Sequence, residues 1–379
     1  MKLILVSANV LWDKKANTPY EHVRTALQTV ANRGNVIFLV SSHEEPSWLK
    51  KYFPFVRFQS CSFKTRQSGE IVQAILNANA KNDLKHSDVI VLGSCNADLF
   101  MAANSRTLLV RCDWVPLEDR IRNYGLPLRE PNGISKLIEI LRDKEPWYFH
   151  WETENMEVFS LINAGTIGEL DSGIIKLKEK LKSCLKDGKI QNRNEFIAYL
   201  LSSLYATNSI RLVDVWGWYP SSVIRNEDNE VMKEFCRLAR TTFGRKTKGP
   251  LFVRHQAASK RHFQKDNRMD PTEQIQTVHI NPAYRDLLKG KTVAVLDDYL
   301  TYGLSFGVAS AMLFTAGVNK VIGIAMGKFG HCAQMYNIQI DDDVYSPIHN
   351  FRIGGRGEML GATSSAAQAD FAMKFQHLM

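Results

Sequence analysis

Residues 293–305 read V-A-V-L-D-D-Y-L-T-Y-G-L-S, and this stretch decides the fold of the second half of the chain. The apolar run at residues 292–296 predicts a buried strand that ends in Asp297 and Asp298. A helix is expected at residues 306–316, because Gly317 is a typical helix stop. Strand, loop and helix in this order are the unit of an open α/β sheet, which binds ligands at the carboxyl ends of its strands.

The loop that follows this strand has the chemistry of a sugar-phosphate site. Unpaired N–H groups at a helix start carry the positive end of the helix dipole and hold phosphate. Gly303 lets the backbone approach a ligand closely, and Thr301 and Ser305 add hydroxyl donors. Asp297 and Asp298 are suited to accept hydrogen bonds from two neighbouring ribose hydroxyls. The competing interpretation is an ordinary surface turn in which the acids occur by chance.

Residues 293–305 resemble the signature of type I phosphoribosyltransferases, which bind 5-phosphoribosyl-1-pyrophosphate (PRPP), and residues 195–379 resemble the competence-type and orotate-like members most. The resemblance implies that Asp297 and Asp298 bind the ribose. It implies that the 5′-phosphate loop consists of Thr301, Tyr302, Gly303, Leu304 and Ser305. It also implies Mg²⁺ that is held mainly by ligand oxygens and water, so that no metal site made by the protein alone is expected.

The same resemblance implies two further loops around the pyrophosphate. We predict a strand at residues 210–215 and a pyrophosphate loop at residues 216–222, with Gly217 and Ser221 as ligands, although Trp216, Trp218 and Tyr219 are bulkier than is usual in the family. We predict a basic loop at residues 254–268, where Lys260 and Arg261 would be catalytic together with Asp297 and Asp298. Candidates for the acceptor pocket are residues 341–343, His349 and residues 354–361, and the acidic run is also typical of a solvated turn.

The first 145 residues alternate between strand and helix patterns. Continuous apolar runs predict buried strands at residues 3–6, 35–40, 88–92 and 107–111. Amphipathic patterns predict helices at residues 19–33, 47–53 and 69–79. Strands of this kind, separated by helices, indicate a doubly wound, mainly parallel sheet.

The order of these segments resembles the haloacid-dehalogenase (HAD) fold. Where the family has Asp-x-Asp after its first strand, this chain has Ser7-Ala8-Asn9. Ser41 matches the family's hydroxyl position, either Lys64 or Lys81 its lysine, and Asp98 the last acid of its final motif. The resemblance therefore implies a degenerate site of Ser7, Asn9, Ser41 and Asp98. We expect an inactive scaffold or ligand-sensing domain; an active phosphatase, a different Rossmann-like domain and a merely helix-capping Asp98 are the alternatives.

The chain as a whole is predicted to be α/β, with two doubly wound domains, the first HAD-like or Rossmann-like and the second phosphoribosyltransferase-like. We place the first domain at residues 1–145, a helical connector at 146–208 and the second domain at 209–379. An aromatic cluster opens the connector at residues 147–151, and helices are expected at 174–189 and 192–204. The second domain has further strand patterns at residues 251–254, 276–280 and 320–326, and a long helix at 227–243.

Composition limits the class of protein. The 379 residues are 45% hydrophobic and 23% charged, which is typical of a globular protein, and no run predicts a membrane helix. Six cysteines without a Cys-x-x-Cys pair favour the cytoplasm. The net charge of +9 suits either a pyrophosphate ligand or a nucleic acid.

Three functions therefore stay open at this point. The first is a phosphoribosyltransferase that uses Mg–PRPP to modify a nucleobase, nucleotide or related acceptor. The second is a non-catalytic regulator that senses PRPP, a nucleotide or another sugar phosphate. The third, compatible with both, is an effector subunit of a stress or phage-defence complex, with protein partners, an oligomeric assembly or nucleic acid.

Overall fold

The computed structural model describes residues 1–141, 147–165, 172–186, 193–224, 230–259, 269–330 and 333–378. The chain divides into two compact units. Unit 1 comprises Met1–Lys144, Tyr205–Thr207 and Leu238–Arg245, and unit 2 comprises Glu145–Leu204, Asn208–Arg237 and Lys246–Met379. Within the described residues, no helix combines the length and the apolar character that a membrane crossing requires.

Unit 1 is built on a six-stranded parallel sheet. Its strands are β1 (Leu3–Val6), β4 (Val36–Ser41), β5 (Val56–Ser60), β6 (Val89–Gly93), β7 (Leu108–Cys112) and β8 (Leu126–Leu128). Their order is β5-β4-β1-β6-β7-β8, and every neighbouring pair is parallel. The chain order reverses between β1 and β6, so the switch point of the sheet lies at the carboxyl ends of these two strands.

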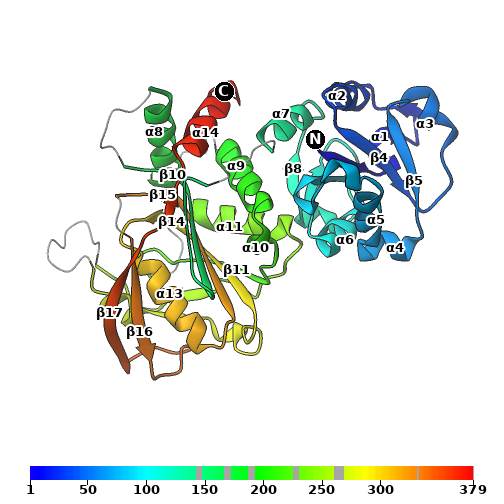
Figure 1. Ribbon diagram of the computed structural model, residues 1–379. Coiled ribbons are helices and arrows are strands. Elements are labelled where there is room, and N and C mark those ends of the chain that lie inside the picture. The colour runs from blue at the N-terminus through cyan, green and yellow to red at the C-terminus, as the bar shows by residue number, and fades with distance from the viewer. Residues whose placement is uncertain are drawn as a thin grey trace. The chain divides into compact units, whose positions relative to one another are not determined.

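Helices cover both faces of this sheet (Figure 1), as the continuous apolar strands require. Helices α2 (Glu21–Asn32) and α7 (Gly133–Ile140) pack together on one face. On the other face, α5 (Glu70–Ala78) and α6 (Asn96–Ser105) form one core with alternate strand residues, and α4 (Phe63–Ser68) packs against α5 and α6. The shorter elements of unit 1 are α1 (Ala8–Leu11), β2 (Trp12–Asp13), β3 (Thr18–Pro19) and α3 (Ser47–Tyr52).

Unit 2 has a six-stranded mixed sheet in the order β11-β14-β15-β10-β9-β18. The four strands β11 (Val215–Trp218), β14 (Thr292–Leu300), β15 (Lys320–Lys328) and β10 (Met156–Asn163) are parallel. Strand β9 (Phe149–Glu152) runs antiparallel to β10, and β18 (Ala362–Thr363) antiparallel to β9. Beside the sheet lie two antiparallel ribbons, β12 (Phe252–Arg254) with β13 (Val278–Ile280) and β16 (Ala333–Ile340) with β17 (Phe351–Met359).

The helices of unit 2 pack against its strands and against one another. Helix α13 (Leu304–Thr315) belongs to a core cluster of the unit and packs against β16 (Figure 1). Helices α8 (Ser172–Lys186) and α14 (Ser365–Leu378) pack against each other, and α14 contacts β10. The remaining helices are α10 (Asn208–Arg211) and α12 (Thr272–Thr277), together with α9 (Arg193–Ala206) and α11 (Glu230–Thr242), whose last residues are counted with unit 1.

The predicted α/β class with two sheets is confirmed, but three local predictions are wrong. Residues 147–163 are not part of a helical connector: they form β9 and β10 and supply core residues to the second sheet. The strand predicted at residues 210–215 begins only at Val215, because Asn208–Arg211 is helical. Strand β14 does not end at Asp297 but continues through both acids to Leu300, because β15 pairs with it up to Lys328.

Candidate functional site

The two acids lie in β14 where the strand loses one of its neighbours. Strand β11 pairs with β14 only up to Leu296, and Tyr219 N–H donates the last hydrogen bond to the Leu296 carbonyl at 2.8 Å. Beyond that point β14 pairs with β15 alone among the described strands. Successive strand residues face opposite sides of a sheet. Asp297 therefore shares its side with the core residues Val293 and Val295, and Asp298 takes the other side.

Asp297 is linked to the start of helix α13. Its carboxylate accepts a hydrogen bond at 2.9 Å from the Asp298 N–H, and the Ser305 hydroxyl at the helix start is near enough to lower the pKa of Asp297. Burial of the carboxyl group, followed by the charge of Asp298, raises the pKa of Asp297 to about 8. At neutral pH this group is therefore ready to exchange a proton when a ligand enters.

Asp298 is linked instead to helix α8. The ammonium of Lys186, the last residue of α8, forms an ion pair with Asp298 Oδ2. The same ammonium lies 5.3 Å from the ring centroid of Tyr299, within the range of a cation–π contact. The other oxygen, Asp298 Oδ1, accepts the Tyr299 N–H at 2.8 Å. The Lys186 side chain is 47% exposed and that of Asp298 23%, so this pair faces solvent.

Helix α13 begins without a side-chain cap. Its N-cap residue is Gly303, with φ of +77°, and within the described part of the chain no side chain caps the helix by accepting a hydrogen bond from its first N–H groups. A Cβ at Gly303 would lie 2.4 Å from the Gln334 carbonyl oxygen, and Gln334 N–H donates to the Tyr302 carbonyl at 3.1 Å. Strand β16 therefore holds the loop from one side, which explains the glycine by conformation and by packing together.

The five predicted 5′-phosphate residues come together in this junction, but they differ in accessibility. Thr301 is exposed, and Tyr302 and Ser305 are half-buried. Leu304 is 2% exposed, so only its backbone N–H is suited to a ligand. The sequence assigned this loop through its motif, and the geometry of the junction is compatible with that assignment.

The predicted pyrophosphate loop is largely a buried strand. Gly217 lies inside β11, where a Cβ would meet the side chain of Leu251 at 2.6 Å, so packing alone explains this glycine. Trp216 and Tyr219 are buried, and the Tyr219 hydroxyl donates to Gln274 Oε1 at 3.2 Å. The role of Gly217 as a PRPP ligand stays a prediction.

Ser221 belongs to a segment that Arg254 holds in place. The buried Arg254 guanidinium donates to the Ser221 carbonyl, to Thr277 Oγ1 at 2.6 Å and to Gln274 Oε1 at 2.7 Å. The Ser221 hydroxyl is buried and has no hydrogen-bond partner among the described residues. Arg254 is thus a structural residue, although the sequence placed it at the start of the basic loop.

Lys260 and Arg261 lie outside the described residues, so their predicted role stays a prediction. The described residues that flank them form the ribbon of β12 and β13. At its base the two rings of His255 and His279 meet with their Nδ1 atoms 3.0 Å apart. Burial lowers the pKa of His255, helped by Arg254 and His349, and burial with His255 lowers the pKa of His279. A single proton between the two nitrogens satisfies this contact.

The acidic run proposed for the acceptor pocket holds the connection between β16 and β17. Asp342 Oδ2 accepts the N–H groups of His349 and Asn350 at 2.7 and 2.8 Å. Asp343 pairs with Arg285 at 2.7 Å. These contacts match the solvated-turn interpretation of residues 341–343. An acceptor role for this run, for His349 or for residues 354–361 stays a prediction.

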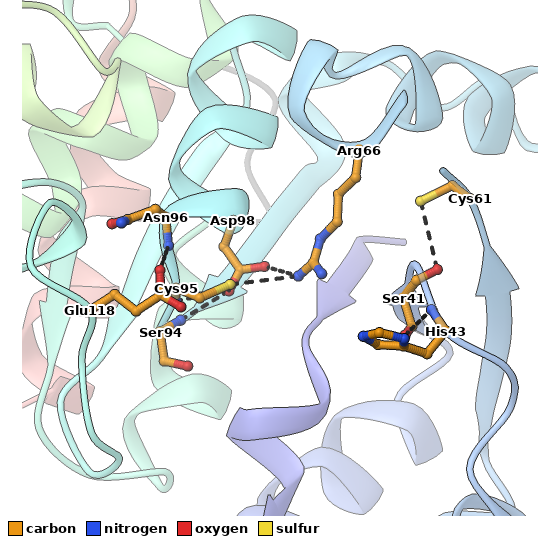
Figure 2. Close-up of polar contacts among 9 residues, drawn as sticks. All are labelled: Ser41, His43, Cys61, Arg66, Ser94, Cys95, Asn96, Asp98 and Glu118. Atoms are coloured by element: carbon orange, nitrogen blue, oxygen red, sulfur yellow. Dashed lines mark hydrogen bonds and ion pairs between the residues drawn. The ribbon is translucent and has the colours of Figure 1, made fainter. Parts of the chain in front are cut away.

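The carboxyl edge of the unit 1 sheet is organised differently, around a buried ion pair. Asp98, near the start of α6, is fully buried, and its Oδ1 lies 2.5 Å from Arg66 Nη2 (Figure 2). Its Oδ2 accepts the N–H groups of Ser94 and Cys95 at 3.0 and 3.3 Å and the Cys95 thiol at 3.1 Å. Both oxygens of Asp98 are therefore occupied by protein donors.

The other predicted residues of this edge offer no reactive group. Ser7 is buried, and its hydroxyl has no hydrogen-bond partner among the described residues, so no base contacts it. Asn9 is half-buried, and Ser41 accepts the His43 N–H at 3.0 Å (Figure 2). Burial, followed by the charge of Asp98, raises the pKa of Cys95 to about 12, so this thiol stays protonated.

Two cations of these edges were not found from the sequence. Lys64 and Lys81, the predicted lysines of unit 1, are both exposed, whereas Arg66 from α4 contacts Asp98. Asp98 is the single charged residue in the helix of residues 96–105, and a charged residue is rarely buried without a partner. The sequence alone does not show which residue that partner is. Lys186 lies 112 positions from Asp298, and no sequence pattern joins them.

Comparisons with known proteins add little to this description. No protein-family model and no curated protein matches the chain. A solved structure that resembles part of it is the cobalt-bound form of deoxy-D-mannose-octulosonate 8-phosphate phosphatase from Haemophilus influenzae. That likeness has 8% identity and a TM-score of 0.24, and it covers 31% of this chain and 71% of the phosphatase. A likeness this weak identifies neither a fold nor an activity.

Metal binding by the protein alone requires several His, Cys, Asp or Glu side chains close together. Among the residues that the structure describes, no three His, Cys, Asp or Glu side chains gather as a metal site would require. At unit 1 the lone Asp98 is already neutralised by Arg66. At unit 2 the two acids alone would leave most positions of a Mg²⁺ ion to a ligand and water, which is how a phosphate-bound Mg²⁺ is normally held.

Proposed function

We propose that the junction of β14 and α13 binds a doubly phosphorylated pentose, PRPP, and that unit 2 is a phosphoribosyltransferase. The observation that carries this proposal is the short connection, residues 301–303, between the acids of β14 and the uncapped start of α13. It joins the uncapped helix start and the acids of β14 into one site, with a phosphate-binding end and a hydroxyl-binding end. The partially exposed side chains of Asp297, Asp298 and Ser305 leave this site accessible.

Each end of the ligand has matching groups in this site. The 5′-phosphate would accept hydrogen bonds from the backbone N–H groups at residues 304–306 and from the Thr301 hydroxyl. The ribose would lie across the free edge of β14, where Asp297 and Asp298 flank the strand and each accepts one hydroxyl. The Ser305 hydroxyl, at the helix start, would donate its single proton to the phosphate.

Transfer would move C1 of the pentose from the pyrophosphate oxygen to a nucleophilic atom of the acceptor. Mg²⁺, held by oxygens of the ligand and by water, would neutralise the departing pyrophosphate when bound. The chain's own contribution is to orient the ribose through the two acids and to fix the 5′-phosphate, so that C1 faces the acceptor. Lys260 and Arg261 are the residues that we propose for the pyrophosphate.

A second candidate function is PRPP sensing without turnover, and one observation favours it. The segment at residues 219–222 is closed by Tyr219, by the Arg254 contact to Ser221 and by the hydrogen bond from Ala258 N–H to the Ser222 carbonyl at 2.8 Å. A loop held in this way has little freedom to close over pyrophosphate. Pyrophosphate release from Mg–PRPP with a panel of nucleobases and nucleotides separates the two functions: release supports transfer, and tight binding without release supports sensing.

We propose no phosphatase activity for unit 1. Its edge offers a protonated thiol, a serine without a base and an acid occupied by Arg66. A scaffold or a protein-binding role, including one in a defence or stress complex, is compatible with this edge. Absence of hydrolysis of phosphate monoesters with Mg²⁺ or Co²⁺ is the expected result.

The binding proposal is tested by calorimetric titration of the full chain with PRPP in the presence of Mg²⁺. We expect Asp297→Asn/Asp298→Asn to weaken binding at least about tenfold, because each acid accepts a ligand hydroxyl. The matched control is Asp286→Asn/Glu154→Gln, which replaces two exposed acids of unit 2 by their amides. Equal affinity of the wild type and of the Asp297/Asp298 variant would refute the assignment.

A further inference from the structure

We infer that Lys186 recognises the anionic group on C1 of the bound sugar, so that the site selects a pentose phosphorylated at both ends over a pentose 5-phosphate. This inference rests on the proposed function of the β14–α13 junction. It assigns a specificity-determining cation to a site for which the sequence predicted only Lys260 and Arg261.

The order of groups along the site carries the inference. The helix start that would hold the 5′-phosphate lies on the Asp297 side of β14, because α13 packs in one core cluster with Val293 and Val295, which face the same side as Asp297. Lys186 contacts the other acid, Asp298, and the ring of the next residue, Tyr299. Along the carbon chain of PRPP, the 2- and 3-hydroxyls lie between C5, which carries the phosphate, and C1, which carries the pyrophosphate. A ligand whose hydroxyls meet the acids therefore extends its C1 substituent past Asp298, toward the end of α8.

Lys186 is available to a ligand because its present contacts hold it weakly. Its side chain is 47% exposed, and a solvent-facing ion pair contributes about 0–1 kcal/mol to stability. An ammonium has three donors, so Lys186 is able to keep Asp298 and contact a phosphate oxygen together. Asp298 Oδ1 and Oδ2 retain further lone pairs, so a ribose hydroxyl does not have to displace Lys186.

Charge gives the selectivity its direction. The negative charge of the acid pair repels an anionic ligand, and Lys186 is a cation that the described structure places in contact with Asp298. Its positive charge offsets this repulsion on the Asp298 side, where a pyrophosphate would arrive. The 5′-phosphate is held on the other side by backbone N–H groups, so it does not depend on Lys186.

The test compares two ligands on matched variants of the full chain. Binding of PRPP and of ribose 5-phosphate is measured by calorimetry at constant Mg²⁺ for the wild type, Lys186→Met, Lys186→Arg and Lys182→Met. Lys182 is exposed on the same helix, one turn earlier, and its replacement changes the net charge equally. Thermal unfolding of each variant checks that α8 remains folded.

We expect Lys186→Met to weaken PRPP about tenfold, the loss of one charge-assisted contact, and to change ribose 5-phosphate by less than about twofold. Lys186→Arg retains most of the PRPP affinity, and Lys182→Met behaves as the wild type. Equal weakening of both ligands would mean that Lys186 only supports the acids, and tighter binding of both would mean that it blocks them. Either result overturns the inference and leaves the proposed function standing. A wild type that binds neither ligand removes the proposed function and this inference with it.

Discussion

The two sheets of this chain both present acids at a carboxyl edge, and they treat them in opposite ways. In unit 1, Asp98 is fully buried and both of its oxygens are occupied, by Arg66 and by donors from Ser94 and Cys95. In unit 2, Asp297 has a pKa raised to about 8 and Asp298 pairs with a half-exposed Lys186. The first arrangement is complete without a ligand, and the second leaves two acids close together with one cation, Lys186, in contact with them among the described residues.

This difference teaches where to look for binding. A buried acid with a full set of partners stabilises the fold and has no capacity left for a substrate. A raised pKa means that burial and a neighbouring charge disfavour the ionised form of the acid. Near an uncapped helix start, a ligand that donates hydrogen bonds to the acid is able to offset this cost. The comparison therefore supports a structural role for the edge of unit 1 and our proposal of ligand binding at the edge of unit 2.

The largest effect is expected at the carboxyl edge of unit 1, where both oxygens of Asp98 have partners. Arg66→Met leaves the Asp98 carboxylate buried without a counterion, which typically costs about 3–5 kcal/mol of stability. The unit 1 transition in scanning calorimetry should fall accordingly, whereas Lys64→Met on the same helix, exposed in the wild type, should leave it unchanged. Adding Asp98→Leu should recover part of the loss. A drop below about 1 kcal/mol in Arg66→Met would show that the pair is dispensable.

The next effect tests whether β16 fixes the start of α13. Gly303→Ala places a Cβ against the Gln334 carbonyl at a φ of +77°, so it should destabilise unit 2 by about 2 kcal/mol or more. Gly290→Ala is the control, because Gly290 has a similar φ of +71° but open space around its Cα. It should cost only about 1 kcal/mol. Equal losses in chemical denaturation would mean that the packing against β16 is unimportant.

A gain in stability is expected from replacing Asp297 at the carboxyl edge of the unit 2 sheet. The folded pKa of Asp297 is above its unfolded value, so the folded state binds more protons between about pH 4 and pH 8 and loses stability as pH rises through that window. Asp297→Asn removes this cost and should raise the unfolding temperature by about 4–8 °C at pH 8, if it relieves ~2 kcal/mol. The gain should be smaller at pH 5. An unchanged or lower unfolding temperature at pH 8 contradicts the raised pKa.

The smallest effect belongs to the pair of His255 and His279. The folded pKa values of His255 and His279 are lowered, so their contact is fully present above the unfolded pKa of about 6.5 and is lost as pH falls below it. His279→Gln should flatten the decline in unit 2 stability between pH 7.5 and pH 5 by less than about 1 kcal/mol. His349→Gln should flatten this decline in stability by a smaller amount, because His349 is a minor cause of the lowered pKa of His255. A steeper decline in His279→Gln would contradict the pairing.

Local patterns predicted much of the fold. The apolar runs at residues 3–6 and 88–92 form β1 and β6 of the parallel sheet, and the amphipathic run at 19–33 contains α2. These elements follow from burial of their own side chains. Strand β14 beyond Leu296 was not predictable in this way, because Asp297, Asp298 and Thr301 make a polar stretch, and only pairing with β15 extends the strand.

The candidate site was predictable through its motif but not through its partners. Asp297, Gly303 and Ser305 are within nine residues of one another, so one pattern contains them. Arg66 and Lys186 reach their acids across 32 and 112 positions, and many other lysines and arginines fitted equally well. Such pairs depend on how strands and helices pack, which charge and spacing in the sequence do not encode.

The most direct test of the contrast between the two edges is hydrogen exchange of the full chain with and without Mg–PRPP. The account predicts slower exchange in peptides that contain the amides of residues 302–306, because these groups would hold the 5′-phosphate, and no change in peptides over residues 92–99 of unit 1. Protection of residues 92–99, or unchanged exchange at residues 302–306 under saturating ligand, would contradict it.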